Sequence, residues 1–456
     1  MSLEGCSISH LDGFFIGYSI AQIGKEFDLL RFGMDFILNI EIKSEIKTAE
    51  KAKKILKQMR ENYYYLKFLG LPIMIFTYVE NDGIYQYNID SNSVEKTTYD
   101  CISKIIKKQS IDYSIDPDKK FVPSNYLISP FNSTDRFIGG EYFLTSAQQK
   151  IKDEIKSELK SNPFMFFCIS ANAGTGKTLL TYDIAKEYLT YGKKVLLIHC
   201  GKLNDGQIKL INTYGWDIKS IRAIPKNSKD LILDKYDFIF VDEAQRIRLL
   251  QLNVLIEKAI KENTPIMFSF DTKQYLREGE TRDLGEFLTN THPHITTSIK
   301  KLTTKIRTNK EIASFITNLM EIGKSKDHLN YNCITVDYLN DCDDLKAYVD
   351  FLQTKDWAPI TYTTSQIHLD PYDKLTIISD KNAHDVIGQE FSKVVFVMNE
   401  NFRYNGNKLT ALGSYYSAKG MLYQIVTRVV DELKIIVFNN PELYIKLLDI
   451  KKLGNQ

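Results

Sequence analysis

The chain has 456 residues, of which 43% are hydrophobic and 25% are charged, and its formal net charge at pH 7 is +2. This length predicts two to four domains, and the composition is typical of a folded globular protein. The near-neutral charge neither demands nor excludes a nucleic-acid partner. No apolar run reaches the length of a membrane span, and the N-terminus shows no signal-peptide pattern. We therefore expect a cytoplasmic protein without a membrane partner.

The first predicted elements are two strands, residues 26–33 and 35–45, that turn as a β-hairpin near Gly33. Strand alternation places Asn39, Glu41 and Lys43 on one face and the apolar residues between them on the other. If Asp28 on the partner strand projects toward Glu41, the two carboxylates and a backbone carbonyl can chelate one Mg²⁺ ion. Lys43 could then orient a metal-bound water for attack on a phosphodiester.

A helix over residues 48–69 and two strands, residues 72–79 and 83–87, follow this hairpin. With its Asp…Glu-x-Lys pattern, the order resembles the PD-(D/E)xK nuclease fold. The resemblance covers residues 1–110 and implies a restriction-endonuclease-like domain. Its catalytic residues would be Asp28, Glu41, Lys43 and Gln58, with Asp28 and Glu41 as metal ligands. The alternative is a clamp that binds nucleic acid without cutting it, because few residues before Asp12 are left for the acidic first helix usual in such nucleases.

A connector over residues 111–140 is predicted next, since three prolines there fall in a stretch rich in Ser, Asn, Asp and Gly. Beyond it, short apolar runs of strand character alternate with helical stretches. This pattern predicts an α/β fold with parallel sheets covered by helices on both faces. The expected strands are residues 194–200, 237–241, 265–271, 375–378, 393–397 and 433–438.

Residues 164–178 carry the strongest motif of the chain, an apolar strand, a small-residue loop and Lys-Thr at the start of a helix. Such a loop points its backbone N–H groups at phosphate oxygens, and the helix N-terminus adds partial positive charge. Lys177 can reach the β- and γ-phosphates, and the Thr178 hydroxyl can hold Mg²⁺. The usual first glycine is Ala171 here. We predict a site for ATP in which the loop residues are Ala173, Gly174, Thr175, Gly176, Lys177 and Thr178.

Residues 236–245 form a buried strand that ends in two acids. Asp242 is placed to hold the Mg²⁺ ion, and Glu243 to polarise the water that attacks the γ-phosphate.

At this point residues 141–456 resemble the superfamily 1 helicases and translocases, and a bacterial family related to the helicase part of Schlafen proteins. The resemblance implies two RecA-like domains, residues 141–297 and 298–456. In residues 144–148, Gln148 would read the adenine. In residues 269–274, Gln274 would sense the γ-phosphate, and in residues 302–307, Arg307 would lie near it.

Two later segments extend the resemblance. In residues 384–391, the resemblance implies that Gly388 would lie near phosphate and Glu390 near the ribose, and in residues 422–428 that Arg428 would be an arginine finger. The loop 199–204 matches the family's single-strand contact poorly and is interpreted as a plain connection.

The sequence thus predicts an ATP- and Mg²⁺-dependent motor coupled to a DNA nuclease, with a role in phage defence or DNA repair by analogy. Single-stranded DNA is the expected partner, and RNA stays open. The alternative is an ATP-driven nucleic-acid-binding switch, or an RNA remodeller, whose N-terminal domain does not cut.

Overall fold

The computed structural model describes residues 7–20, 25–44, 49–121, 128–225, 231–272, 274, 276, 283–303, 309–327, 329–365 and 370–453. The chain forms two compact units, residues 1–127 with 141–146, and residues 128–140 with 147–456. Within the described ranges, no helix combines the length and apolar character needed to cross a membrane. The predicted domain boundaries stay predictions, although each unit corresponds broadly to one half of the expected organisation.

The first unit is built on a six-stranded sheet in the order β1-β2-β3-β4-β5-β6. The predicted hairpin is confirmed, because β2 and β3 pair antiparallel. The predicted helix is confirmed as α1 (Ala49–Leu66), which connects β3 to its parallel neighbour β4. The strands are β1 (Phe14–Ser19), β2 (Glu26–Phe32), β3 (Ile37–Lys43), β4 (Ile73–Val79), β5 (Gly83–Asn88) and β6 (Ser93–Thr97).

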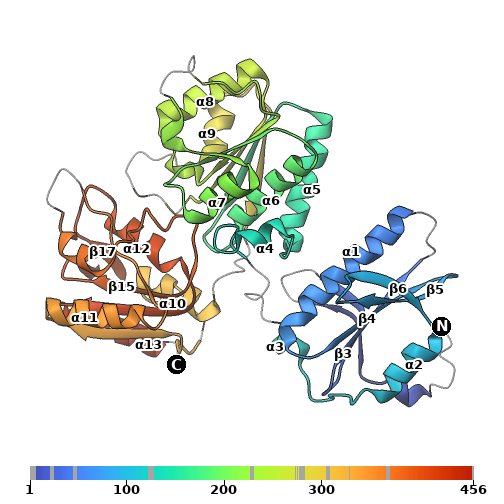
Figure 1. Cartoon of the computed structure of the whole chain (residues 1–456). Coiled ribbons are helices and arrows are strands. Elements are labelled where there is room, and N and C mark those ends of the chain that lie inside the picture. Colours follow the sequence, from blue (N-terminus) through green and yellow to red (C-terminus); the bar gives the residue numbers. More distant parts are fainter. Residues whose placement is uncertain are drawn as a thin grey trace. The chain divides into compact units, whose positions relative to one another are not determined.

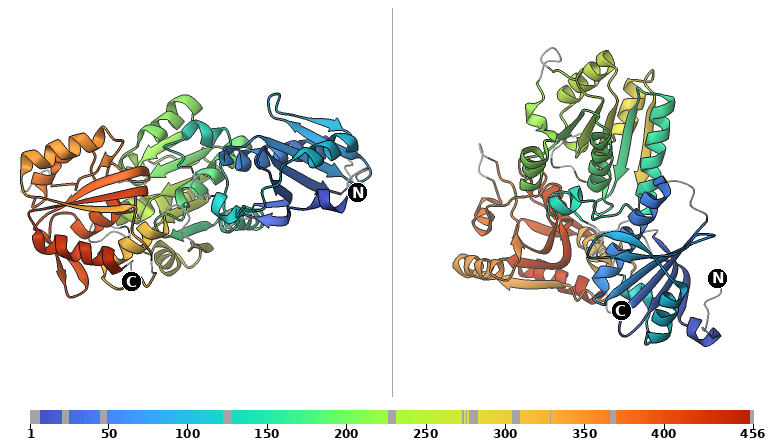
Figure 2. Two further views of the ribbon diagram at one scale, coloured as in Figure 1. Left: turned by 90° about the horizontal axis from the view of Figure 1, so that it is seen from below. Right: turned by 45° about the vertical axis from the view of Figure 1, so that its right-hand side comes forward.

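Helices cover this sheet on both faces (Figures 1 and 2). On one face, Ile55 and Met59 of α1 pack against Ile75 of β4. On the other, α2 (Tyr99–Lys108) packs Ile102 against Leu38 of β3. Asn39 and Glu41 of β3 therefore lie under α1 and are buried, whereas Ile42, predicted on the apolar face, is 50% exposed near the strand's end. The short elements of this unit are the 3₁₀ helices η1 (Ile8–Leu11) and η2 (Lys67–Leu69) and the helix α3 (Pro117–Lys120).

The second unit contains two lobes, and the first is a parallel six-stranded sheet in the order β12-β7-β11-β10-β8-β9. Its strands are β7 (Phe166–Ala171), β8 (Val195–His199), β9 (Asp217–Ser220), β10 (Phe238–Asp242), β11 (Ile266–Phe270) and β12 (Thr297–Leu302). The predicted boundary between residues 297 and 298 falls within β12, yet β12 pairs with β7 along its length and so completes the first sheet.

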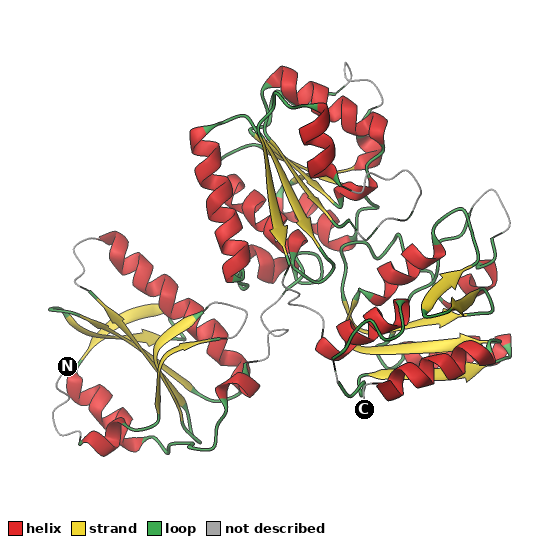
Figure 3. Cartoon of the chain, turned by 180° about the vertical axis from the view of Figure 1, so that it is seen from behind, coloured by secondary structure: helices red, strands yellow, loops and turns green. Residues whose placement is uncertain are grey.

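Helices cover both faces of this first-lobe sheet because its four central strands, β7, β11, β10 and β8, are apolar on both faces (Figure 3). One face packs against α8 (Leu249–Glu262) and α9 (Leu284–Thr291), and α6 (Lys177–Thr190) contacts β8, β10 and β11. The remaining elements are α4 (Thr134–Ile138), α5 (Ser146–Ser161), α7 (Asp205–Tyr214), η4 (Ile221–Ala223) and η6 (Ala244–Arg246). Residues 111–140, predicted as a connector, thus contain the short helices α3 and α4.

The second lobe has a four-stranded parallel sheet in the order β13-β18-β15-β14, and a separate hairpin of β16 and β17. One predicted strand is wrong, because residues 375–378 belong to the 3₁₀ helix η7 (Asp373–Ile378), in which Leu375 and Ile378 supply apolar core contacts without joining the sheet. The other elements are α10 (Lys310–Met320), β13 (Ile334–Leu339), α11 (Cys342–Gln353), β14 (Ala358–Pro359), β15 (Phe391–Met398), β16 (Phe402–Asn405), β17 (Lys408–Ala411), α12 (Ala418–Val426), β18 (Val429–Phe438) and α13 (Pro441–Leu453).

Candidate active sites

The phosphate-binding loop joins β7 to α6 at the carboxyl edge of the first-lobe sheet. Gly174 and Gly176 have φ values of 75° and 77°, in the left-handed region that favours glycine. These turns let α6 begin directly at Lys177. The loop N–H groups and the helix N-terminus are therefore arranged to receive an anion.

Gln148 at the start of α5 is fully buried and holds this loop from behind. Its side-chain amide donates to the carbonyls of Thr175, at 3.0 Å, and Gly176, at 3.2 Å. A Cβ atom on Gly176 would lie 2.3 Å from the Gln148 Nε2 atom, so a larger residue there would displace the amide group that holds the loop. The sequence predicts Gln148 as an adenine reader, whereas the described contacts are with the loop backbone.

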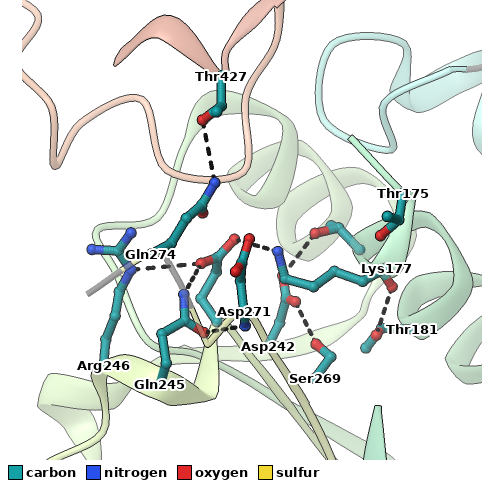
Figure 4. Close-up of polar contacts among 12 residues, drawn as sticks. Thr175, Lys177, Thr181, Asp242, Gln245, Arg246, Ser269, Asp271, Gln274 and Thr427 are labelled. Carbon is teal, nitrogen blue, oxygen red and sulfur yellow. Dashed lines mark hydrogen bonds and ion pairs between the residues drawn. The ribbon is translucent and has the colours of Figure 1, made fainter. Parts of the chain in front are cut away.

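The predicted magnesium ligands lie together beside the loop. The Thr178 hydroxyl lies 3.5 Å from Asp242 Oδ2, and Ser269 Oγ donates to Asp242 Oδ1 at 2.6 Å. A carboxylate and a hydroxyl are hard oxygen donors that suit Mg²⁺. Ser269 orients the carboxylate through its own hydrogen bond, a role that the sequence motif did not indicate. Figure 4 shows Asp242 and Ser269 beneath Lys177, joined by this hydrogen bond.

Glu243 follows in the left-handed region, with φ of 56°, and its side chain is 1% exposed. Its Oε1 atom lies 3.4 Å from Lys177 Nζ, and its Oε2 atom accepts from Gln245 Nε2 at 2.7 Å and lies 3.5 Å from Arg246 Nε. Burial alone would raise the pKa of Glu243, but Lys177, Arg246 and Arg428 together hold that pKa well below its ordinary value. The carboxylate is thus ionised and surrounded by cations.

Side chains of the second lobe contact the residues around Glu243. Gln274 donates to Thr427 Oγ1 at 3.2 Å, and Arg246 donates to Gln424 Oε1 of α12 at 2.9 Å. Arg428 is 6% exposed, and burial lowers its pKa, although the nearby charges of Glu243 and Glu390 oppose this shift. Arg428 therefore lies within electrostatic range of the carboxylate predicted to polarise water.

The other predicted second-lobe residues, Gly388 and Glu390, contact residues outside the cluster around Glu243. Gly388 has φ of 76°, and a Cβ atom there would lie 2.9 Å from a ring carbon of Phe131. The backbone carbonyl of Glu390 accepts a hydrogen bond from Asn132. Arg307 lies outside the described residues, so its predicted role stays a prediction.

A cavity of about 750 Å³ opens beside the nucleotide site, between loops of the two lobes. Its wall combines cationic side chains with hydroxyl, histidine and tyrosine side chains, and the loop after β8 contributes to it. The cationic lining residues are Lys202, Arg222, Arg246 and Arg248, and the ring-bearing ones are His384, Tyr415 and Tyr416. One acidic residue, Asp385, also lines the cavity and pairs with Lys202 at 3.0 Å. Cations recognise backbone phosphates and rings stack on bases, so this lining suits a single nucleic-acid strand. The loop interpreted from sequence as a plain connection therefore contributes a candidate contact, Lys202.

His199 is a second residue that sequence reasoning left without a role. It ends β8, is fully buried, and lies with its Nδ1 atom 3.6 Å from Asp242 Oδ2. Within the described structure neither ring nitrogen has a hydrogen-bond partner. Its position at the carboxyl end of a strand, next in the sheet to the strand bearing Asp242, was the available signal.

In the first unit, Glu41 is 1% exposed and is held by amide side chains. Asn39 and Asn62 donate to its Oε1 atom at 3.2 and 2.8 Å, and Gln58 donates to Oε2. Burial raises the pKa of Glu41, an effect that Lys25 opposes and Asp28 reinforces. Asn62 was missed from sequence, although its spacing of four residues from Gln58 puts both on one face of α1.

Lys43 lies between the two predicted carboxylate ligands. Its Nζ atom is 3.8 Å from Asp28 Oδ2 and 3.7 Å from Glu41 Oε2, while Asp28 also accepts from the Ile42 N–H at 2.7 Å. The structure therefore brings all four predicted nuclease residues together. Two carboxylates facing one cation position suit Mg²⁺ chemically, although no group of three or more acidic, histidine or cysteine side chains placed to hold a metal occurs among the described residues.

The fold and the loop define a P-loop NTPase with two parallel-sheet lobes. Residues 165–356 match the family described as "Schlafen group 3, DNA/RNA helicase domain", and no curated protein matches the chain. Among solved structures, the chain is similar to unliganded Pif1 from Bacteroides sp, at 13% identity and a TM-score of 0.36, covering 69% of this chain and 97% of that one. It is also similar to Pif1 helicase from Candida albicans, at 13% identity and a TM-score of 0.38, covering 68% and 99%. At these values the structural likeness assigns no activity.

Proposed function

We propose that the second unit is an ATP-dependent motor that moves along or remodels a single strand of nucleic acid. One observation carries the proposal: the carboxylate of Glu243 lies against the phosphate loop, within range of Arg428 from the other lobe, and beside a cationic cavity. The match of residues 165–356 to a DNA/RNA helicase domain supports the same function.

The proposed chemistry divides between the lobes. Lys177 and the loop N–H groups bind the triphosphate, while Asp242 and Thr178 supply oxygens for Mg²⁺, which neutralises phosphate charge when bound. Glu243 orients the attacking water, and Arg428 stabilises charge that develops on the γ-phosphate. Because these groups come from both lobes, a bound γ-phosphate is an anion that the two lobes share, and it favours the closed arrangement. Its loss on hydrolysis removes this shared anion and lets the lobes open.

ATP turnover with and without oligo(dT) or oligo(U) tests this function. We expect turnover that a single strand stimulates, and Lys177→Ala should abolish it while the circular dichroism spectrum stays unchanged. A wild-type protein that does not hydrolyse ATP in either condition would refute the motor. Stronger stimulation by RNA than by DNA would identify an RNA remodeller instead.

A second proposal concerns the first unit, as a Mg²⁺-dependent nuclease. It is favoured by the convergence of Asp28, Glu41, Lys43 and Gln58, residues that come from two strands and a helix. Asp28 and Glu41 would hold the ion, and Lys43 would donate to a phosphate oxygen or orient water. Mg²⁺ would supply Lewis-acid activation of the scissile phosphate.

Cleavage of end-labelled single- and double-stranded DNA, with and without ATP, tests the nuclease. Glu41→Ala should abolish cleavage and keep ATP turnover, whereas Lys177→Ala should remove only the ATP-dependent part of cleavage. Absence of cleavage by the wild type, with ATP turnover still stimulated by DNA, would favour a non-catalytic clamp.

A further inference from the structure

Arg246 belongs both to the surroundings of Glu243 and to the wall of the cationic cavity. The 3₁₀ helix η6 starts immediately after Glu243, which places the Arg246 guanidinium back over that carboxylate, with Nε 3.5 Å from Oε2. The Arg246 side chain is 5% exposed there, yet the same residue lines the cavity with Lys202 and Arg248. One guanidinium is thus shared between a catalytic carboxylate and a binding surface.

The contact between Arg246 and Glu243 is a loose one. The Arg246 Nε atom has no hydrogen-bond partner in the described structure, and 3.5 Å exceeds the length of a charge-assisted hydrogen bond. A guanidinium binds phosphate through paired N–H groups, so a nucleic-acid phosphate in the cavity offers Arg246 a better partner. Movement of Arg246 toward the cavity would leave Glu243 with one cation fewer.

The other cation on Glu243 has an alternative partner too. Lys177, 3.4 Å from Oε1, is the residue that binds the β- and γ-phosphates once ATP enters. With ATP bound and the cavity empty, Arg246 still restrains the carboxylate at contact distance, in addition to the charge of Arg428. Arg246 also donates to Gln424, whose carbonyl accepts from Arg428 Nε at 3.3 Å, so a shift of Arg246 reaches the arginine finger as well.

Resting on the motor function proposed above, we infer that Arg246 couples nucleic-acid binding to ATP hydrolysis. It holds Glu243 while the cavity is empty and turns to a backbone phosphate when a single strand is bound. Hydrolysis then requires that two cations leave the Glu243 carboxylate. ATP draws Lys177 away from it, and nucleic acid draws Arg246 away. In this role Arg246 is a positioning residue that limits turnover in the absence of a strand.

Arg246→Gln tests the coupling, with Arg403→Gln as the matched control, since Arg403 is exposed on β16 and does not line the cavity. We expect Arg246→Gln to raise the kcat without nucleic acid by roughly threefold or more, because a carboxylate released from its contact with Arg246 can turn to the attacking water. KM for ATP should stay the same, and the ratio of stimulated to basal turnover should fall. Arg403→Gln should leave all three unchanged.

A measurement without ATP supplies an independent readout. We expect fluorescent oligo(dT) to bind Arg246→Gln with a shallower slope of log K against log salt concentration than it binds the wild type. The slope should be smaller by about 0.7, the value for one lost phosphate contact on a single strand. Arg246→Lys keeps a cation beside Glu243 and should retain low basal turnover; it also serves as the test if the Gln variant does not fold.

Three outcomes would overturn the inference. The first is an unchanged ratio of stimulated to basal turnover in both Arg246 variants, and the second is an equal fall of basal and stimulated kcat, which would make Arg246 a structural or catalytic residue. The third is an unchanged salt dependence. If the wild type itself does not hydrolyse ATP, the motor function fails and the coupling fails with it. Failure of the coupling alone is distinguishable, because the wild type then still hydrolyses ATP.

Discussion

The ion pairs between α5 and α6 provide a sharp test of how the nucleotide site is supported. Glu187 on α6 binds two lysines of α5, Lys152 at 2.6 Å and Lys156. The same two helices carry Gln148 and Lys177, which meet at the phosphate loop. Replacing Glu187 by Gln removes the charge from this pairing while keeping the shape of the side chain.

The magnitude follows from the shifted pKa of Glu187. Burial would raise this pKa, but hydrogen bonds from Lys152 and Lys156 lower it from 4.5 to about 2. At about 1.4 kcal/mol for each pKa unit, the shift corresponds to about 3 kcal/mol of stability at pH 7. Because the folded-state pKa is lowered, this stability is present above pH 4.5 and is lost as the pH falls toward 2. By pH 3 it should be about 1.5 kcal/mol.

Urea unfolding followed by tryptophan fluorescence measures this effect. A Trp357→Phe background leaves Trp216, which stacks on Tyr182 of α6 and so reports on the first lobe. Glu187→Gln should lower the free energy of unfolding by about 1–3 kcal/mol at pH 7 and by clearly less at pH 3. Glu257→Gln, the same change at an exposed site on α8, should have little effect at either pH. An equal loss at both pH values would refute the reasoning.

Three further changes test the nucleotide site. Arg428→Ala should lower kcat by about 100-fold or more while changing KM for ATP far less, because the finger acts mainly on transition-state charge; an equal loss of ATP binding would contradict this role. Ser269→Ala should raise the Mg²⁺ concentration for half-maximal turnover by about tenfold, since Asp242 loses its orienting hydrogen bond; a metal titration would show it. Gly388→Ala should cost about 1–2 kcal/mol of stability in thermal unfolding, because of its φ and the close ring of Phe131.

Contiguous motifs were predictable because neighbours along the chain largely determine them. The phosphate loop needs only a strand, small residues and a helix in sequence, so β7, Lys177 and α6 were found from the sequence. The hairpin of β2 and β3 was found for the same reason, since period-two alternation and a turn are local features. The prediction of a strand at residues 375–378 was wrong. A short apolar segment does not show whether its side chains fill a core from a strand or from a 3₁₀ helix.

The sequence by itself identified the candidate residues for phosphate chemistry, since Lys177, Asp242 and Glu243 lie in recognisable local patterns. Only the tertiary structure decided what surrounds them. The hydrogen bond from Arg246 to Gln424 joins residues 178 positions apart, and that from Asn62 to Glu41 joins a helix to a strand. Such pairs depend on how separate elements pack, and no local periodicity encodes that arrangement.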